Sequence, residues 1–196
     1  MKKKKNNHKC IVITAPSGAG KTTVVKHLLK TFPDLGFSIS ATNRPRRPNE
    51  TDSKDYYFLS TGEFRKRIVD DDFVEYEEVY QGRLYGTLRS ELERLWEMDK
   101  TILFDIDVQG ALKIRKNTNA ECRTIFVKPP NELVLIDRLR QRKTESPEDL
   151  KVRIEKVRNE LSYQNCFDNI LVNDILEVTL KEAELMVEEF LNLEAN

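Results

Sequence analysis

The stretch from Ile11 to Leu29, IVITAPSGAGKTTVVKHLL, constrains the fold of this chain more than any other part of it. Residues 11–14 are apolar or β-branched, which predicts a buried strand. A turn of Pro, Ser, Gly and Ala residues follows, and Lys21 then begins a run whose apolar residues have helical spacing. A strand that passes through a short turn into a helix is the first half of a βαβ unit, so we expect an α/β fold.

The turn fits the pattern G-x-x-x-x-G-K-[ST], except that Ala15 takes the place of the first glycine. In this pattern backbone N–H groups surround phosphate oxygens at a helix N-terminus, the lysine reaches the β- and γ-phosphates, and the hydroxyl binds Mg²⁺. Alanine lacks only the freedom of glycine at positive φ, and Gly18 and Gly20 remain. The sequence therefore predicts a nucleoside triphosphate site formed by Ala15, Pro16, Ser17, Gly18, Ala19, Gly20, Lys21, Thr22 and Thr23.

Further along the chain, short apolar runs alternate with longer helical patterns, which predicts a parallel sheet flanked by helices. Ser60 and Glu63 have the spacing of a capping box at the start of a helix. Residues 38–90 break the alternation with a polar, Pro-rich loop and two strand-like runs, which indicates an inserted, mainly antiparallel subdomain. Outside this insertion, the strand-like runs are residues 10–14, 101–106, 123–128 and 169–173. The helical patterns there begin near 21, 108, 131, 147 and 176, and those at 131 and 147 extend to about 143 and 167.

Composition narrows the classes of partner. The chain has 33 basic and 33 acidic residues, so its overall charge does not favour a nucleic acid or an anionic membrane as partner. The basic run Lys2–Lys5 has no interleaved aromatic residues, and no stretch approaches the roughly 18 apolar residues of a membrane span. Three widely spaced cysteines form neither a disulfide framework nor a zinc motif. We expect one domain over residues 1–196, in the cytoplasm.

A phosphate-binding loop alone does not distinguish GTPases, ATPases and kinases. Asp107 and Gly110 have the spacing of a GTPase switch element, but no N-K-x-D guanine-reading motif follows. Arginines are a better guide, because phosphoryl transfer between two nucleotides brings many negative oxygens together. Arg44, Arg46 and Arg47 lie in the polar loop, and Arg138 and Arg142 are four residues apart on one face of a predicted helix. This combination favours a kinase.

With these residues the chain resembles the guanylate kinase family nearly from end to end. The resemblance is carried by APSGAGKTT, FSISATNRPRRPNE, KDYYFLS, FVEYEEVYQGRLYGT, LFDIDVQG, RLRQRKTES and NDILE. It implies a core of about residues 8–37, 91–130 and 163–196, a GMP-binding insertion of about 38–90, and a mobile lid of about 131–162. The implied reaction converts ATP and GMP to ADP and GDP with Mg²⁺.

On the GMP side, the resemblance assigns four residues to the phosphate and four to the base. Guanine presents N1–H and its 2-amino group as adjacent donors, which one carboxylate can accept together, whereas adenine would turn a lone pair toward that carboxylate. Strand alternation places Glu75 on the same face as Phe73, Glu77 and Val79. The phosphate residues are Arg44, Arg47, Tyr56 and Tyr85, and the base residues are Ser40, Glu75, Thr87 and Asp107.

On the ATP side, the resemblance places Lys21 on the phosphates and Thr22 on Mg²⁺, and Asp105, at the end of an apolar strand, is a second candidate near the metal or a strand-end cap. Asn173 matches a position that contacts adenine. The residues expected to act in catalysis are Lys21, Arg44 and the lid arginines Arg138, Arg142 and Arg153. Three residues depart from the family pattern, namely Ala15, Asn43 and Lys143.

One alternative from another class is a non-catalytic guanylate-kinase-like module that binds a protein partner. Such a module has no need of Gly20, Lys21 or the lid arginines, all of which this chain retains. A kinase for another phosphorylated nucleotide or sugar is the alternative within the enzyme class, and Glu75, Thr87 and Asp107 argue against it. The sequence leaves open whether the protein is a monomer or a homodimer.

Overall fold

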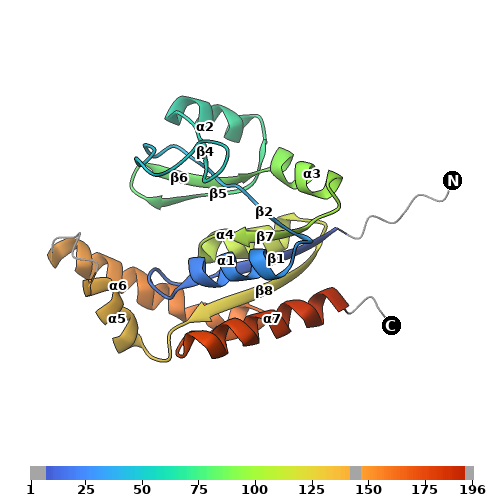
Figure 1. The fold of residues 1–196 in the computed structure, drawn as a ribbon. Helices are drawn as coiled ribbons and strands as arrows, with labels where there is room; N and C mark the ends of the chain where they lie inside the picture. Colours follow the sequence, from blue (N-terminus) through green and yellow to red (C-terminus); the bar gives the residue numbers. More distant parts are fainter. Residues whose placement is uncertain (1–7, 142–146, 193–196) are drawn as a thin grey trace.

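The main body of the protein is a five-stranded sheet between two layers of helices (Figure 1). The computed structural model describes residues 8–141 and 147–192. The strand order is β2-β7-β1-β8-β9, and each adjacent pair is parallel. The predicted α/β fold with a parallel sheet is therefore confirmed. The strands are β1 (Lys9–Thr14), β2 (Leu35–Phe37), β7 (Thr101–Asp105), β8 (Glu121–Lys128) and β9 (Asn169–Val172).

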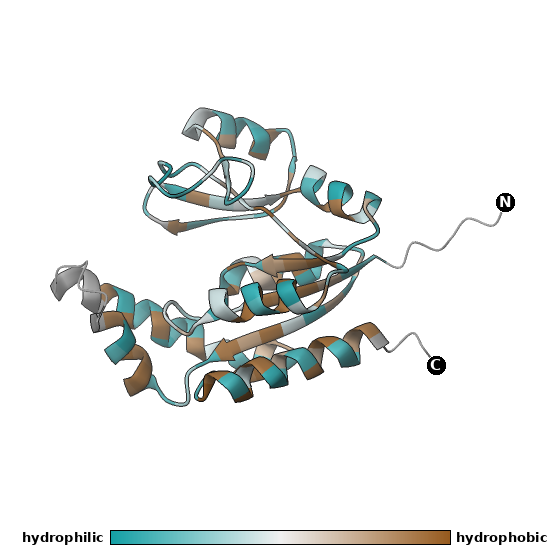
Figure 2. Ribbon diagram, viewed as in Figure 1, coloured by the Kyte–Doolittle hydropathy of each residue, from teal (hydrophilic) through white to brown (hydrophobic). Residues whose placement is uncertain are grey.

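Alternate residues of the central strand point into two separate cores, one on each face of the sheet. Ile11 and Ile13 pack with helices α1 (Lys21–Thr31) and α7 (Leu176–Asn192), whereas Cys10 and Val12 pack with α3 (Arg89–Glu97) and α4 (Val108–Asn117). All residues of β1 are buried, as expected for a parallel strand that is covered on both faces. Figure 2 shows these strands as a brown layer between helices of mixed character.

A second sheet, with order β4-β3-β6-β5, lies over one end of the first (Figure 1). Its β3–β6 and β5–β6 pairs are antiparallel, whereas the β3–β4 pair is parallel, so the sheet is mixed. Helix α2 (Thr61–Val69) covers it and begins with the predicted capping box between Ser60 and Glu63. The strands are β3 (Ala41–Thr42), β4 (Tyr57–Phe58), β5 (Phe73–Tyr80) and β6 (Arg83–Leu88).

The prediction that Phe73 shares a face with Glu75 is wrong. Phe73 pairs with Leu88 and Glu75 pairs with Thr87. From the first pair to the second, β5 advances by two residues and β6 by only one, so β5 contains one extra residue. This bulge interrupts the alternation of the strand. As a result Phe73 stacks on Phe64 in the core of the small sheet, with ring centroids 4.5 Å apart, while Glu75 turns the other way.

Two helices, α5 (Glu132–Gln141) and α6 (Pro147–Ser162), project from the end of the main sheet that faces the small sheet (Figure 1). The helix expected to reach about residue 167 ends earlier, because the chain tightens after Ser162 into the 3₁₀ turn Gln164–Cys166. Strand β2 and helix α3 were not foreseen from the sequence. None of the described helices is long and apolar enough to cross a membrane. The three cysteines are free thiols.

Candidate nucleotide-binding site

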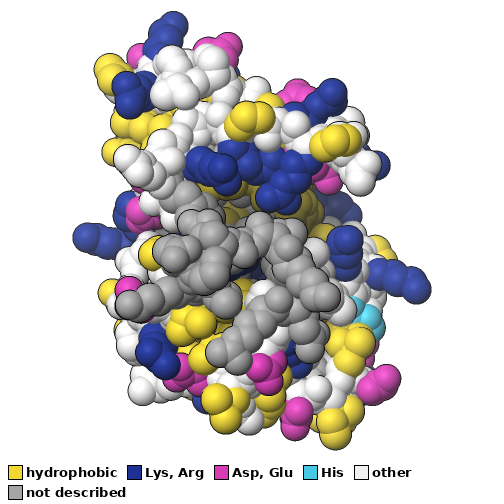
Figure 3. All heavy atoms as spheres, turned by 90° about the vertical axis from the view of Figure 1, so that its left-hand side faces the viewer, with side chains coloured by type: hydrophobic (Ala, Val, Ile, Leu, Met, Phe, Trp, Pro, Cys, Tyr) yellow, Lys and Arg dark blue, Asp and Glu magenta, His cyan; other side chains and the backbone are white. Residues whose placement is uncertain are grey.

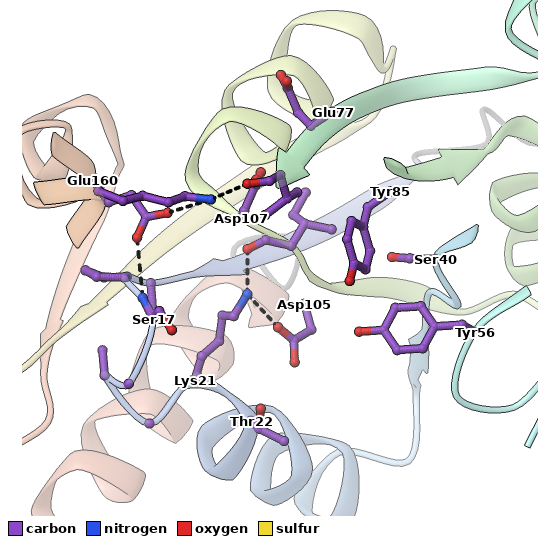
Figure 4. Close-up of a pocket in the computed structure, with 18 of the residues that line it drawn as sticks. Ser17, Lys21, Thr22, Ser40, Tyr56, Glu77, Tyr85, Asp105, Asp107 and Glu160 are labelled. Atoms are coloured by element: carbon purple, nitrogen blue, oxygen red, sulfur yellow. Dashed lines mark hydrogen bonds and ion pairs between the residues drawn. The ribbon is translucent and has the colours of Figure 1, made fainter. Parts of the chain in front are cut away.

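A cleft of about 460 Å³ opens between the carboxyl end of the parallel sheet and the small sheet (Figure 4). In parallel α/β sheets this end of the strands is where ligands bind. The turn after β1 forms one side of the cleft, and β5 and β6 supply residues to the other. The lining residues that the sequence predicted are Ala15, Pro16, Ser17, Gly18, Ala19, Gly20, Lys21, Thr22, Thr23, Ser40, Tyr56, Glu75, Tyr85, Asp105 and Asp107.

The turn between β1 and α1 has the backbone of a phosphate-binding loop. Gly18 and Gly20 have φ values of 91° and 95°, in the left-handed region where a side chain would be strained. Ala15 is not among the residues with positive φ, which explains why alanine is accepted where the pattern has glycine. Helix α1 begins directly after this turn at Lys21, so its first N–H groups and its dipole favour an anion there.

The ammonium group of Lys21 is held at the carboxyl end of β7. It lies 2.7 Å from Oδ1 of Asp105 and donates to the Ile106 carbonyl at 2.7 Å. Its side chain is still 20% exposed, so one side of the charge faces the cleft. Figure 4 shows Lys21 and Asp105 pointing toward each other beside Thr22. A negative ligand in the cleft would therefore meet a cation whose position is already fixed.

Oxygen donors for a divalent cation lie next to this lysine. Among the residues that the structure describes, no group of three or more His, Cys, Asp or Glu side chains could hold a metal ion. The Thr22 hydroxyl and the Asp105 carboxylate nevertheless both line the phosphate end of the cleft. Mg²⁺ is commonly bound by one or two protein oxygens together with substrate phosphates, so this donor set fits Mg²⁺ that arrives with a nucleotide.

Glu75 is a buried carboxylate at the opposite end of the cleft, only 6% exposed. Its Oε1 accepts a hydrogen bond from the Thr87 hydroxyl at 2.7 Å. A Cβ atom on Gly110 would lie 3.1 Å from Oε2, so only glycine leaves that oxygen uncrowded. Burial raises the pKa of Glu75 to about 7, the nearby Asp107 charge adds to the rise, and the Thr87 bond opposes it. A ligand with adjacent N–H donors would satisfy and ionise this group.

Asp107 has a structural role besides lining the cleft. Its Oδ1 accepts from the Gly110 backbone N–H at 2.7 Å and caps helix α4. The cap holds the carboxylate in the cleft lining (Figure 4), near the Glu75 carboxylate. The same contact fixes Gly110 beside Glu75, so Asp107 shapes the buried end of the cleft as well as facing it.

Tyr56, Tyr85 and Ser40 form the wall that the small sheet contributes (Figure 4). The two tyrosine rings meet edge to face with centroids 6.0 Å apart, and burial raises the pKa of Tyr56. The Tyr56 hydroxyl therefore remains a protonated donor near neutral pH. Arg44 lies behind this wall, with its guanidinium 4.9 Å from the centre of the Tyr56 ring.

Arg44 is held by a carboxylate of its own loop. Glu50 contacts Nη1 at 2.7 Å and Nη2 at 2.5 Å, and it also accepts from the Arg47 backbone N–H at 2.8 Å. The Arg44 bond is the largest reason that the pKa of Glu50 falls to about 2. The Arg47 side chain is exposed. Neither arginine lines the cleft itself, although Arg44 adjoins it through Tyr56.

Helix α6 contacts both sides of the cleft. Nη2 of Arg153 donates to the Ser17 hydroxyl at 2.7 Å, and Glu160 accepts from the Ser17 backbone N–H at 3.4 Å. Lys156 donates to the Val79 carbonyl of β5 at 2.9 Å. Burial raises the pKa of Glu160. Lys156 and Glu160 line the cleft but were missed from the sequence; their helical spacing from Arg153, at three and seven residues, was the available signal.

The remaining predicted residues lie outside the cleft lining. Thr87 is behind Glu75, and Asn173 is buried beneath the phosphate-binding loop, where its Nδ2 donates to the Ala19 carbonyl at 2.6 Å. Arg138 contacts the Asn173 carbonyl at 3.4 Å. Arg142 and Lys143 lie outside the described residues. Asn43 bridges strands by accepting from the Leu84 N–H at 2.7 Å, so this departure from the family pattern has a structural use.

The surface around the cleft carries positive charge. Figure 3 shows Lys and Arg side chains gathered on the side of the small-sheet region that overhangs the main body. The chain as a whole has equal numbers of basic and acidic residues, so this gathering is a local feature. A rim of positive charge above a cleft attracts anionic ligands such as nucleotides.

Comparisons with known proteins agree with this geometry. The sequence model of the family described as guanylate kinase matches residues 7–190. A guanylate kinase from Salinibacter ruber is 46% identical over 182 residues, which cover 93% of this chain and 96% of that protein. One from Porphyromonas gingivalis is 44% identical over 184 residues, covering 93% and 98%. A crystal structure of guanylate kinase from Anaplasma phagocytophilum superposes with a TM-score of 0.74 at 28% identity, covering 94% of this chain and 87% of that one.

Proposed function

The chain belongs to the guanylate kinase family, and from this premise we propose that it transfers the γ-phosphoryl group of ATP to GMP, giving ADP and GDP. One observation carries the proposal: a single cleft holds a phosphate-binding loop with Lys21 and, away from that loop, the buried Glu75 that Thr87 supports. The first end suits a triphosphate and the second suits a base that offers hydrogen-bond donors.

Glu75 selects guanine because its buried carboxylate needs hydrogen-bond donors. Its Oε2 is buried near Asp107 and Gly110, and the described protein groups supply one hydrogen bond, from Thr87 to Oε1. Guanine supplies N1–H and the 2-amino group side by side, and both can reach one carboxylate. Adenine would leave the carboxylate facing a lone pair, and an unpaired buried acceptor costs about 1–3 kcal/mol, more when charged. Ser40 and Asp107 complete the base end of the cleft.

Transfer proceeds without a covalent enzyme intermediate, by alignment and charge stabilisation. The N–H groups of the loop and Lys21 bind the ATP phosphates, and Tyr56, Tyr85, Arg44 and Arg47 bind the phosphate of GMP. The Arg44–Glu50 contact holds the guanidinium beside the Tyr56 ring, where its remaining N–H groups can meet that phosphate. The lid arginines Arg138, Arg142 and Arg153 offset charge on the transferred group, and closure excludes water. Asn173 supports the phosphate-binding loop from beneath through the Ala19 carbonyl, and it occupies the position that contacts adenine in the family pattern.

Mg²⁺ would be held by Thr22 with the ATP phosphates, and Asp105 would lie in the surrounding shell. Bound there, the cation would reduce the negative charge of the phosphates. Asp105 already orients Lys21, so its carboxylate serves the same end of the cleft in either role. A non-catalytic binding module would not need the half-buried contact between the Lys21 ammonium and the Asp105 carboxylate at the phosphate-binding loop, which is why we favour the enzyme. The free cysteines agree with a cytoplasmic location.

A coupled assay of ADP release tests the proposal. The purified chain is incubated with ATP and Mg²⁺ and, separately, GMP, AMP, CMP or UMP. ADP release that depends on GMP, with kcat/KM at least about a hundredfold above that for the other nucleotides, is the expected result. Equal rates with all four, or release that does not depend on any monophosphate, would contradict it.

A further inference from the structure

Glu91 is a buried carboxylate that lies outside the cleft and that the proposed reaction does not use. It sits in the first turn of α3 and is only 1% exposed. Its Oε1 accepts from the Ile39 backbone N–H at 2.9 Å and from Nη2 of Arg94 at 2.8 Å. Its Oε2 accepts from the Tyr57 hydroxyl at 2.8 Å and from Nε of Arg94 at 2.9 Å. Each oxygen therefore has two donors, as a buried charge requires.

Two of these donors are immediate neighbours of cleft residues. Ile39 precedes Ser40 and Tyr57 follows Tyr56, and both Ser40 and Tyr56 line the cleft. The Tyr57 N–H also donates to the Ser40 carbonyl at 2.9 Å. Glu91, the 39–40 segment and Tyr57 thus form a closed ring of hydrogen bonds. A displacement of Glu91 would pull on both cleft residues at once.

The ring also spans the connections between the two sheets. Residues 38–40 carry the chain from β2 to the small sheet, and α3 begins directly where β6 ends and the chain returns. Glu91, on α3, therefore joins the outgoing segment to the returning one. Arg94 contributes a different kind of contact, because its side chain is 43% exposed and comes from the same helix, three residues away. It balances the charge of Glu91 but ties no second segment to it.

We propose that Glu91 is a positioning residue for the GMP end of the cleft, which holds Ser40 and Tyr56 in the places where they meet the monophosphate. The inference rests on the proposed function. Glu91 lies outside the cleft and does not touch either substrate. We nevertheless expect it to affect the binding of GMP and not the binding of ATP. The phosphate-binding loop makes no contact with this ring among the hydrogen bonds of the described residues. ATP affinity should therefore be independent of it.

The test compares Glu91→Gln and Tyr57→Phe with the wild type, and uses Glu93→Gln as the matched control because Glu93 is an exposed carboxylate on the same helix. The Kd values of GMP and of Mg-ATP are measured separately by isothermal titration calorimetry, with the melting temperature of each variant. Glu91→Gln keeps the shape of the side chain but puts an amide donor where an oxygen accepted two bonds. We expect it to weaken GMP binding about tenfold, with the Mg-ATP Kd within about twofold of wild type.

Tyr57→Phe should act in the same direction by a smaller factor, and Glu93→Gln should change neither Kd.

Three results would overturn the inference while leaving the proposed function intact. One is unchanged GMP binding in the folded variants, and another is equal weakening of GMP and ATP binding, which would indicate a general structural role. If Glu91→Gln does not fold, Tyr57→Phe is the test, because it removes one hydroxyl from the ring of hydrogen bonds and leaves the Glu91–Arg94 ion pair intact. The third result is an unchanged Kd of GMP in Tyr57→Phe. A wild-type protein that binds no GMP would overturn the proposed function and this inference with it. Normal binding by the wild type and both variants overturns the inference alone.

Discussion

Glu75 combines a cost to folding with a use in binding. Its carboxylate is buried with one hydrogen bond, and its pKa rises to about 7 because the site has little water to solvate the charge. The unfolded chain would ionise this group near 4.5. Ionisation therefore destabilises the fold, and the penalty grows as the pH rises from about 4.5 to about 7, above which it is constant. A ligand that donates two hydrogen bonds would remove the penalty on binding.

Replacing Glu75 by Gln should therefore stabilise the ligand-free protein in a pH-dependent way. Gln keeps an oxygen for the Thr87 hydroxyl and carries no charge to bury. At pH 8 we expect a gain of about 1–3 kcal/mol in the free energy of unfolding, since each unit of pKa shift corresponds to about 1.4 kcal/mol. At pH 4.5 the gain should vanish. Urea denaturation at both pH values measures this, and a variant less stable than wild type at pH 8 would show that the charge is not a burden to the fold.

Helix α3, which carries Glu91, is followed by a residue with an unfavourable backbone conformation, Asp99. Asp99 has a φ of 56°, its N–H donates to the Trp96 carbonyl, and the next N–H, from Lys100, donates to that of Leu95. This is the hydrogen-bond pattern of a helix end that usually has glycine at this position. The Asp99 side chain is exposed. The hydrogen bonds at the end of the helix are thus made, but the positive φ of Asp99 is sterically unfavourable for a residue with a Cβ atom.

Asp99→Gly should stabilise the protein by about 0.5–1 kcal/mol, because glycine adopts positive φ without steric cost. Asp99→Ala is the control, and it should be less stable than wild type because alanine has the Cβ without the short polar side chain that helps aspartate to adopt this conformation. Chemical denaturation of the three proteins gives the order. Equal stabilities for the glycine and alanine variants would contradict the backbone explanation.

Helices and strands could be predicted from the sequence where the local residue pattern determines them. The prediction failed where contacts between residues distant in sequence determine the structure. The apolar runs gave β1, β7, β8 and β9 to within a few residues, and Ser60 and Glu63 gave the start of α2. Strand β2 was missed because it is three residues long and contains Gly36, so only its pairing with β7 makes it a strand. The face of Phe73 was wrong because a bulge depends on the partner strand.

The site divides in the same way. The phosphate-binding loop and Glu75 each lie in a motif that is continuous in sequence, so both could be proposed as site residues from the sequence. Glu160 and Lys156 lie in an ordinary charged helix, and only the packing of α6 against Ser17 and Val79 shows that they face the cleft. Glu91 gave no signal at all, because its partners Ile39 and Tyr57 are 52 and 34 residues away.

The whole molecule consists of parts that meet at the cleft. The small sheet is joined to the main body through the 38–40 segment and α3, and also by α4, where Lys113 donates to the Tyr76 carbonyl and Asn117 to that of Val74. Helix α6 bridges the phosphate-binding loop and β5. Substrates that fill both ends of the cleft would strengthen contacts between these parts, whereas one substrate would engage only its own end.

Hydrogen exchange should report this coupling. We expect a non-hydrolysable ATP analogue together with GMP to protect the amides of β5, β6 and α6 more than either ligand alone, because the closed arrangement needs both. Protection of α2, which lies on the outside of the small sheet, should change least. Protection by the ATP analogue alone that equals that of both ligands would indicate a cleft that does not close in response to GMP.

Recognition of guanine by Glu75 is the step on which the specificity of the proposed reaction depends. Glu75→Gln offers one acceptor and one donor to a base with two donors, so one N–H must face another. The ratio of kcat/KM for GMP to that for AMP, measured in the coupled assay, should fall by about 30-fold to 1,000-fold, equivalent to about 2–4 kcal/mol, chiefly through loss with GMP. Glu78→Gln, on the exposed side of the same strand, should leave the ratio unchanged. An unchanged ratio in Glu75→Gln, with both substrates declining together, would contradict the claim and leave Glu75 as a structural residue.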